Sequence, residues 1–478
     1  MRGKKEFKPK QHYAFSLDDA IPKDHLLRRL DAILDLSFID ELTEDLYGYN
    51  GNVSIDPVVV VKVLLLDFLY NIGGVRETIR QVEDRLSFRW FIGYDIDEDI
   101  FDHSAISKNL KRFGAYLFKE MFDRSVRQCI RNGLVGGKLV HIDSTTVKAD
   151  ASVKSVHHKR PADKFHPHIA PREYWDKVNK AAKKEHPNVN DRIESTTDPD
   201  SSIHSHDGKK LGLYYKDHRA ADDKHGVIIA TQATGAEVTD EKQFKPLLNG
   251  IIFGKQLLPE TVAADTIYGC AENHKELIDK GIEPNIPHVR SPGKKGVFNK
   301  DKFTYIPEKD IYICPAGNTL HPPSNSETKR RRFRAYAADC ADCELRSKCT
   351  TAKGPRTIKR HSDEAYVEQA LQHRDTPKFH YNMGRRMAVV EGGFGDAKEY
   401  RGHRQAQWRG LEKMQIQCYL VATAQNLKKL LKYAWKDADS VANQCKTIIF
   451  ALFRDFRYEF TAIFYACAKH NTLKSFNL

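Results

Sequence analysis

The chain has 478 residues, enough for roughly two to four domains of about 100 to 200 residues each, so a mini-protein held together only by disulfides or metals is excluded. Its 40% hydrophobic and 29% charged residues are typical of a folded globular protein and exclude disorder throughout. Lys and Arg number 77 against 64 Asp and Glu. The resulting net charge of +13 favours a polyanionic partner such as nucleic acid.

The sequence predicts a protein that stays in the cytoplasm. The basic residues at the start are followed by no apolar run, so no secretory signal is expected. The most hydrophobic late stretch, 447–453, is far shorter than the roughly 20 apolar residues of a membrane span. Nine cysteines, an odd number, argue against a disulfide framework and favour reduced thiols or metal ligands.

Residues 1–135 are predicted to form an all-helical domain. The stretch 57–70 has the pattern of a helix that is capped by Asp56, is apolar on most sides and ends before two glycines. Further helices are predicted over 75–86 and, with a break at Gly114, over 104–131. The exposed positions of the last one carry Lys108, Lys111 and Arg112, which suits either a DNA groove or a solvated basic face.

After residue 137 the hydrophobic period changes from 3.6 to 2, which predicts a strand over 138–147 and the start of an α/β domain, 136–434. Two strand-like runs, 211–222 and 226–234, predict a hairpin. A strand, a helix and a second apolar run over 261–287 predict a βαβ unit.

Two inserts interrupt the predicted α/β domain. One, 152–207, is polar and contains seven histidines, whose wide and irregular spacing favours loop positions over a metal site. The other, 291–360, is basic and contains cysteines. Helical periodicity then returns, with helices predicted from residue 387 and over 411–431, and an aromatic-rich helical tail, 435–478, ends the chain.

Two acids follow apolar strands of the α/β domain. Asp143 and Asp265 are each expected at a strand end, and ligands of open α/β sheets gather at the carboxyl ends of strands. If the strands are neighbours, the two carboxylates can share Mg²⁺, and a pair of such ions stabilises the attacking and leaving oxygens of a phosphoryl displacement. The alternative is that each acid is an ordinary turn or helix-cap residue.

Glu391 is the third carboxylate that such a site needs. Lys398 lies seven residues later, nearly on the same face of the predicted helix. A basic side chain that can bind phosphate would then lie beside an acidic side chain that can bind a metal ion. The alternative is a solvated Glu–Lys pair. Three glycines follow in this helix, at 392, 393 and 395, and each destabilises a helix by about 1 kcal/mol relative to Ala. Close approach of another backbone, protein or DNA, would explain why glycine is present at these positions.

The chain resembles the insertion-sequence DDE transposases of bacteria, which have a ribonuclease H-like catalytic domain. The resemblance covers roughly residues 15 to 430, and the order and spacing of its motifs are specific. These motifs are 54–66, 102–107, 141–149, 197–200, 264–269, 390–398, 409–413 and 426–430.

The resemblance implies that Asp143, Asp265 and Glu391 form a metal-binding triad for two Mg²⁺ or Mn²⁺ ions. It also implies cleavage and joining of DNA strands at element ends, with Lys398 and Arg386 as the basic residues of the glutamate motif. The expected partners are double-stranded DNA, as terminal inverted repeats and target, and a second copy of the chain in a homodimer at the bacterial nucleoid. No membrane partner is expected.

One departure from the family pattern concerns this arginine. A related signature consists of a tyrosine, an arginine, a glutamate and a lysine, and its arginine lies four residues before the glutamate. This chain has Met387 at that position, whereas Arg386 lies five residues before Glu391. Tyr381 is also displaced from the tyrosine position of that signature. The interval between Glu391 and Lys398 does fit.

A second constellation lies in the basic insert. Cys314, Cys340, Cys343 and Cys349 are separated by 25, 2 and 5 residues and supply four thiolates, the set that binds structural Zn²⁺ in zinc ribbons. The alternative is four scattered reduced cysteines. The arginines and lysines of 329–334 and 356–360 add positive charge, which predicts contact with a DNA backbone unless it is merely solvated.

Two other functions stay open on the sequence alone. One is a DNA-binding regulator or inactive relic that keeps the fold without the chemistry, although all three carboxylates are present. The other is a nuclease of the same fold, which would cleave strands without joining them.

Overall fold

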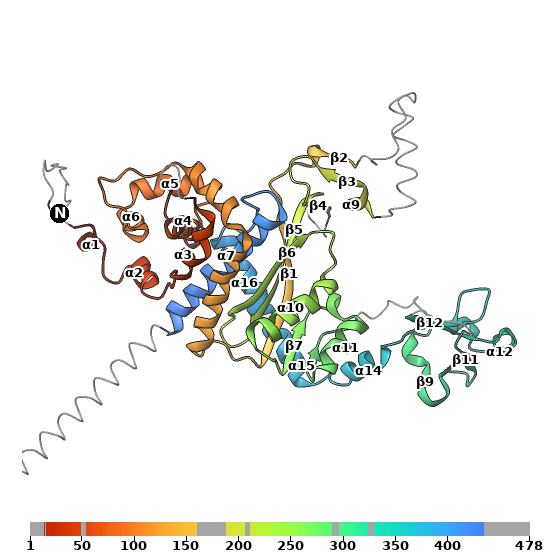
Figure 1. Ribbon diagram of the computed structural model, residues 1–478. Coiled ribbons are helices and arrows are strands. Elements are labelled where there is room, and N and C mark those ends of the chain that lie inside the picture. The colour runs from red at the N-terminus through yellow and green to blue at the C-terminus, as the bar shows by residue number, and fades with distance from the viewer. Residues whose placement is uncertain are drawn as a thin grey trace, which may run out of the picture.

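The computed structural model describes residues 14, 16–48, 54–159, 188–205, 211–288, 296–323 and 329–434. The predicted tail, 435–478, and the histidines at 166, 168, 186 and 206 lie outside these residues. Figure 1 shows short helices gathered on one side, a mixed sheet flanked by helices in the centre, and a smaller sheet on the side away from the first helices.

The helical region follows the sequence prediction closely. Helix α4 (Pro57–Tyr70) is capped by Asp56, whose Oδ1 accepts from Val58 N at 2.7 Å, and ends at left-handed Asn71. Gly114 interrupts the longest helix with φ 65° and ψ −177°, which confirms the predicted break. The other helices of this region are α1 (Leu17–Ala20), α2 (Leu26–Asp31), α3 (Phe38–Thr43), α5 (Val75–Asp84), α6 (Leu86–Ile92) and α7 (His103–Arg131).

The helical region is not closed on itself. Its apolar core, built on α4, also contains Ala397, Ile416, Leu420 and Val421, which come from the C-terminal part of the chain. A helix over 411–434 supplies three of these residues. Among the described residues, no single helix has the length and apolar character of a membrane span. Only α4 and α5 taken together, as a pair bent by 95°, have that length and apolar character.

The central sheet contains six strands in the order β4-β5-β1-β7-β8, with β6 also paired to β5. Strand β1 (Leu139–Lys148) is antiparallel to β5 (Gly212–Asp222) and parallel to β7 (Thr261–Ala264), and β7 is parallel to β8 (Glu283–Asn285). The predicted hairpin is β5 with β6 (Ile228–Gly235), and the predicted βαβ unit is β7, α11 (Ala271–Asp279) and β8. Strand β4 (Ser202–His204) and helix α10 (Asp240–Lys255) complete this layer.

Within the polar insert, β2 (Val156–His158) pairs with β3 (Ile193–Ser195) beside α9 (Val189–Arg192). The basic insert forms a five-stranded antiparallel sheet with its own core, which includes Phe303, Tyr312 and Phe333. Its elements are β9 (Thr304–Ile306), β10 (Ile311–Ile313), β11 (Thr319–His321), β12 (Arg330–Ala335), α12 (Ala337–Ala341), α13 (Arg346–Cys349) and β13 (Thr357–His361).

The chain then returns to the central sheet through α14 (Glu364–Leu371) and α15 (Pro377–Arg386). A π-helical turn, η6 (Met387–Glu391), connects α15 to α16 (Gly392–Tyr400) without a break. The predicted helix from residue 387 is therefore the continuation of a longer helical segment that starts at Pro377.

Candidate active site

Asp143 and Asp265 lie side by side at the centre of the sheet. The parallel register pairs Ile142 with Ala264, so the next residue on each strand is one of the two acids. Asp265 follows β7, as predicted. Asp143, however, is not at a strand end, because β1 continues to Lys148 against β5. The apolar run ends at Asp143 because the pairing with β7 ends there, while the backbone remains in the sheet.

Arg386 brings Glu391 to these acids. Its Nη1 donates to Asp143 Oδ2 at 2.6 Å, and its Nη2 lies 3.6 Å from Glu391 Oε1. The side chain of Arg386 is only 10% exposed and that of Asp143 19%, whereas Glu391 is 52% exposed. The guanidinium therefore lies between a half-buried and an exposed carboxylate.

The π turn explains how an arginine at this position reaches Glu391. A regular helix stacks residues four apart, whereas a π turn stacks residues five apart. The turn η6 occupies the interval between Arg386 and Glu391. The extra residue in the sequence is absorbed by this turn, and Met387, at the expected arginine position, is exposed.

The environment of Asp143 disfavours its charged form. Burial raises the pKa of Asp143 to about 6, and the negative charge of Asp265 adds to the rise, while the Arg386 guanidinium opposes it. The backbone N–H groups of Ser144 and Thr266 each donate to the carboxylate that precedes them, at 2.8 and 2.6 Å. These contacts fix both acids, and a divalent cation would remove the penalty on charging Asp143.

Lys398 also faces this site. Its Nζ donates to Thr145 Oγ1, two residues after Asp143 on β1. Alternate residues of a strand lie on the same face, so Lys398 and Asp143 lie on one side of the sheet. The five site residues that the sequence singled out are thus brought to one region.

A second arginine contact, besides that of Arg386, holds α15 against the sheet and was not predicted from the sequence. Arg385 donates from Nε to Asp223 Oδ1 at 2.9 Å and from Nη2 to the Asp223 carbonyl at 2.8 Å, and His141 Nε2 donates to the same carboxylate at 2.8 Å. Asp223 is in the turn of the β5–β6 hairpin. Two consecutive arginines therefore bind α15 to the sheet at separate points. An adjacent Arg pair before an acid was the only signal in the sequence.

A buried polar network beneath the site was also missed. Asp217, on β5, is fully buried and accepts from Arg219 Nε at 2.7 Å, Thr231 Oγ1 at 2.7 Å and His403 Nε2 at 2.8 Å. Arg219 donates to Gln425 Oε1, and Gln425 Nε2 donates to the Gly393 carbonyl at 2.8 Å. The network therefore reaches the backbone of the helix that follows Glu391.

This network contains the one set of three ligand-type side chains, among the residues described, whose ligand atoms all lie within 4.8 Å of one another: Asp217, His403 and Cys418. It does not fit a cation. Burial raises the pKa of Asp217, but the Arg219 guanidinium and the hydrogen bonds to this carboxylate together outweigh this effect and hold that pKa below its usual value. Arg219 therefore already neutralises the charge of Asp217. Burial raises the pKa of the Cys418 thiol, which keeps it protonated. The set is a structural one.

The helix that carries Glu391 presents an open glycine face. A Cβ built on Gly392, Gly393 or Gly395 meets no atom of the described chain within 4 Å. No other part of the described chain makes the close approach predicted for these glycines. The predicted approach of another backbone, protein or DNA, would therefore have to come from outside the described chain.

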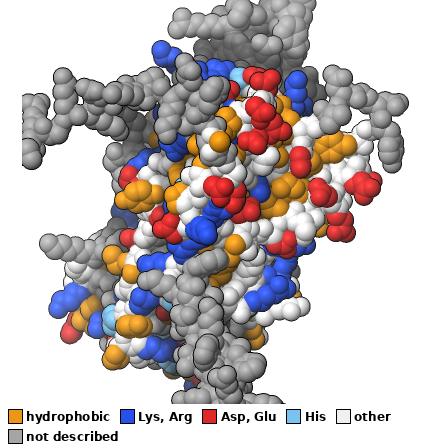
Figure 2. Space-filling view, turned by 90° about the vertical axis from the view of Figure 1, so that its left-hand side faces the viewer, with side chains coloured by type: hydrophobic (Ala, Val, Ile, Leu, Met, Phe, Trp, Pro, Cys, Tyr) orange, Lys and Arg blue, Asp and Glu red, His pale blue; other side chains and the backbone are white. Residues whose placement is uncertain are grey.

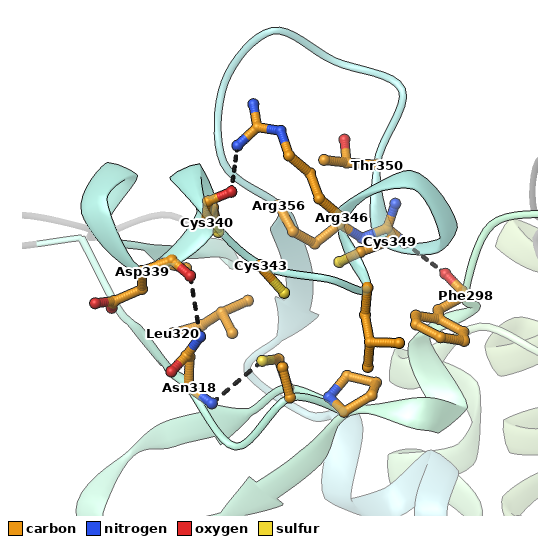
Figure 3. A pocket seen from close by; sticks show the side chains of 15 residues that line it. Phe298, Asn318, Leu320, Asp339, Cys340, Cys343, Arg346, Cys349, Thr350 and Arg356 are labelled. Atoms are coloured by element: carbon orange, nitrogen blue, oxygen red, sulfur yellow. Dashed lines mark hydrogen bonds between the residues drawn. The ribbon is translucent and has the colours of Figure 1, made fainter.

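The four cysteines of the basic insert line one small cavity of about 20 Å³ (Figure 3). All four are free thiols. Burial raises the pKa of Cys349, and the neighbouring thiols Cys314, Cys340 and Cys343 add to that rise, so the four groups are close in space. The backbone N–H of Asn318 donates to Cys314 Sγ at 3.3 Å.

The cysteines outside this cavity differ in burial. Cys129 and Cys418 are buried, Cys270 is half-buried, and residues 445 and 467 lie outside the described chain. His157 and His158 are exposed but lie on β2, and His204 lies on β4, so the prediction of loop positions is wrong for these three histidines.

The basic positions of α7 are exposed, but the surface around the helices is mixed. Lys108, Lys111 and Arg112 all face solvent. Figure 2 looks at the molecule from the side on which the N-terminal helices lie, and acidic and basic side chains are interspersed over that face. Both interpretations of the basic helix therefore remain open.

Comparison with known families identifies the class of protein. Residues 15–112 match the family "Transposase domain (DUF772)", and residues 313–431 match the "Transposase DDE domain". Two separate segments of the chain therefore match transposase families, the second of them a DDE domain. The second match contains Glu391, Arg386, Lys398 and the four cysteines, whereas Asp143 and Asp265 lie between the two matched segments.

Solved structures add little to this assignment. A cryo-EM structure of the piggyBac transposase synaptic complex with hairpin DNA is 10% identical in sequence, with a TM-score of 0.37 over 86% of this chain and 76% of that chain. None of the curated proteins matches the sequence.

Proposed function

We propose that this transposase cuts and joins DNA at the ends of an insertion sequence, using divalent cations held by Asp143, Asp265 and Glu391. One observation carries the proposal: the sheet register sets Asp143 beside Asp265, and Arg386 links Asp143 to Glu391. Three carboxylates with the buried guanidinium of Arg386 between them have the donor chemistry that Mg²⁺ or Mn²⁺ prefers. Two such ions would activate the attacking oxygen and stabilise the leaving one.

The protein's own contribution is positioning and charge. Asp143 and Asp265 are held by backbone N–H groups, and Glu391 is oriented by the π turn. In our proposal, Arg386 and Lys398 contact the phosphates beside the scissile bond, which places positive charge where negative charge develops. The open glycine face leaves room for the DNA backbone to approach Glu391.

The strand order supports a ribonuclease H-like catalytic domain. Three antiparallel strands, β6-β5-β1, are extended by two parallel strands, β7 and β8, and acids lie on the central strand and after its parallel neighbour. We assign 136–434 to this domain, 1–135 to the helical domain and 435–478 to a C-terminal tail. The shared core of α4 and the 411–434 helix implies that the first two domains are firmly attached.

We also propose that Cys314, Cys340, Cys343 and Cys349 bind one structural Zn²⁺. The shared cavity, the effect of the three other thiols on the pKa of Cys349 and the N–H···S bond to Cys314 support it. Four thiolates would contribute folding energy to a small sheet with a limited core of its own. The partners that we propose are double-stranded DNA at the nucleoid and a second copy of the chain.

The test is a cleavage assay on a plasmid that carries the gene with its natural flanking DNA. Asp143→Asn, Asp265→Asn and Glu391→Gln should each abolish cleavage in Mg²⁺ or Mn²⁺ while DNA binding persists. Glu399→Gln is the matched control, because Glu399 is an exposed carboxylate of the same helix that pairs with Arg404. Full activity in a triad variant would remove that residue from the site, and cleavage without joined products would indicate a nuclease.

A further inference from the structure

The arginine-rich strand β12 has two faces of different character. Side chains alternate along a strand, so Arg331 and Phe333 face one side and Arg332 and Arg334 the other. Phe333 is fully buried in the core of the small sheet, whereas Arg332 and Arg334 are exposed. The basic run in the sequence is therefore not a single surface.

The arginines on the core side are used by the fold. Arg331 binds Asp310 through both terminal nitrogens, at 2.5 and 3.0 Å. Arg360, on β13, binds Glu368 in the same way at 2.6 and 3.1 Å and also donates to Tyr312. Such two-pronged contacts are the strong form of ion pair and neutralise both guanidinium groups.

The cations on the outer side have no such role. Arg332 lies directly opposite Lys359 in the register of β12 and β13. Arg332, Arg334 and Lys359 form no ion pair with any carboxylate of the described chain, and like charges that face each other across strands destabilise a sheet. Tyr336 extends the same face, is 63% exposed and packs against the His321 ring, with centroids 4.9 Å apart.

We propose that this outer face, formed by Arg332, Arg334, Lys359 and Tyr336, binds the sugar–phosphate backbone of duplex DNA at a site separate from the carboxylates. Alternate residues of a strand are about 7 Å apart. A phosphate recurs about every 3.4 Å of axis on each DNA strand, and because the strand winds around that axis its successive phosphates lie further apart than this rise, so Arg332 and Arg334 can each meet a phosphate of one strand. The inference rests on the proposed function, because it assumes that DNA is the substrate.

Contacts to phosphates carry little sequence information but fix the position of a duplex. The small sheet is separated from the N-terminal helices by the central sheet (Figure 1). DNA bound on the outer face would therefore be held at one side of the catalytic domain, and the site would add affinity for any sequence. An anionic membrane is the less favoured ligand, because apart from Tyr336 the face has no large apolar side chain to insert.

The test compares two double variants of the full chain that remove equal charge. Arg332→Gln with Lys359→Gln changes the outer face. Lys302→Gln with Lys309→Gln changes exposed lysines at the β9 end of the same insert. Fluorescence anisotropy with a duplex of the natural flanking sequence and an unrelated duplex would give affinity as a function of salt concentration.

The outer-face variant should bind both duplexes more weakly, with a slope of log K against log salt that is less steep by about 1 to 2, and the control should match the wild type. Its melting temperature should not fall, since two facing like charges are removed. Arg334→Gln, measured separately, should reduce the slope by about 1. An unchanged slope in both, or tighter binding to phosphatidylserine vesicles than to DNA, would overturn the proposal.

The outcomes distinguish this inference from the proposed function. If the wild type cleaves its flanking DNA but the outer-face variants bind like the wild type, the surface is wrong and the active site stands. If the variants lose DNA affinity while the wild type never cleaves in Mg²⁺ or Mn²⁺, the surface stands and the proposed function fails.

Discussion

Binding of Mn²⁺ to the DNA-free protein should weaken as the pH falls through about 6. Asp143 must lose its proton before it can act as a metal ligand, and burial raises its pKa from the ordinary 3.8 to about 6. With that pKa, about nine in ten Asp143 side chains are ionised near pH 7 and about one in ten near pH 5. The apparent affinity for Mn²⁺ should therefore fall about tenfold over this range.

The same shift gives the sign of an effect on stability. For a carboxyl group with a raised pKa, the stabilising contribution is complete below the unfolded pKa of 3.8 and is lost as the pH rises through about 6. In the metal-free protein, ionised Asp143 therefore lowers the free energy of unfolding near neutral pH. Added Mn²⁺ should raise the melting temperature more near pH 7 than near pH 5, because it favours the charged form.

Isothermal titration of Mn²⁺ at about pH 5, 6 and 7, at constant ionic strength, would measure this dependence. Asp143→Asn should bind weakly at every pH, and Glu399→Gln should follow the wild type. A carboxylate with an ordinary pKa would be almost fully ionised over the whole range. An affinity that changes less than about twofold, or that changes equally in Asp143→Asn, would refute the assignment of a raised pKa and a ligand role to Asp143.

Three further outcomes are expected. Cys343→Ser should lower the zinc content measured by elemental analysis and increase proteolysis within 310–350, and wild-type protein with less than about a tenth of an equivalent of zinc would contradict the site. Gly395→Ala should raise the free energy of unfolding by up to about 1 kcal/mol, since its Cβ has open space, but should reduce cleavage if DNA approaches there; unimpaired cleavage would contradict that role. Arg386→Lys keeps the charge but cannot span Asp143 and Glu391, so cleavage should fall about tenfold or more while DNA affinity changes little, and wild-type cleavage would show that the two-pronged contact is dispensable.

The sequence by itself determined the local structure and the positions of two acids of the candidate site along the chain. Alternating apolar residues predicted β1, the β5–β6 hairpin and the βαβ unit, and the cap at Asp56 and the glycine at 114 predicted where helices begin and break. These features depend on neighbours along the chain, whose spacing and backbone preferences can be read directly. The acids Asp143 and Asp265 were located in the same way, because each follows an apolar run.

Only the tertiary structure decided how distant residues meet. The extent of β1 beyond Asp143 depends on pairing with β5, and the contact of Arg386 with Glu391 depends on a π turn that no spacing rule predicts. The clamp of Arg385 on Asp223 joins residues 162 positions apart, and the Asp217 to His403 contact joins residues 186 positions apart. The two faces of β12 likewise follow from strand pairing and from the side that the core occupies, since the same basic run would read identically on either face.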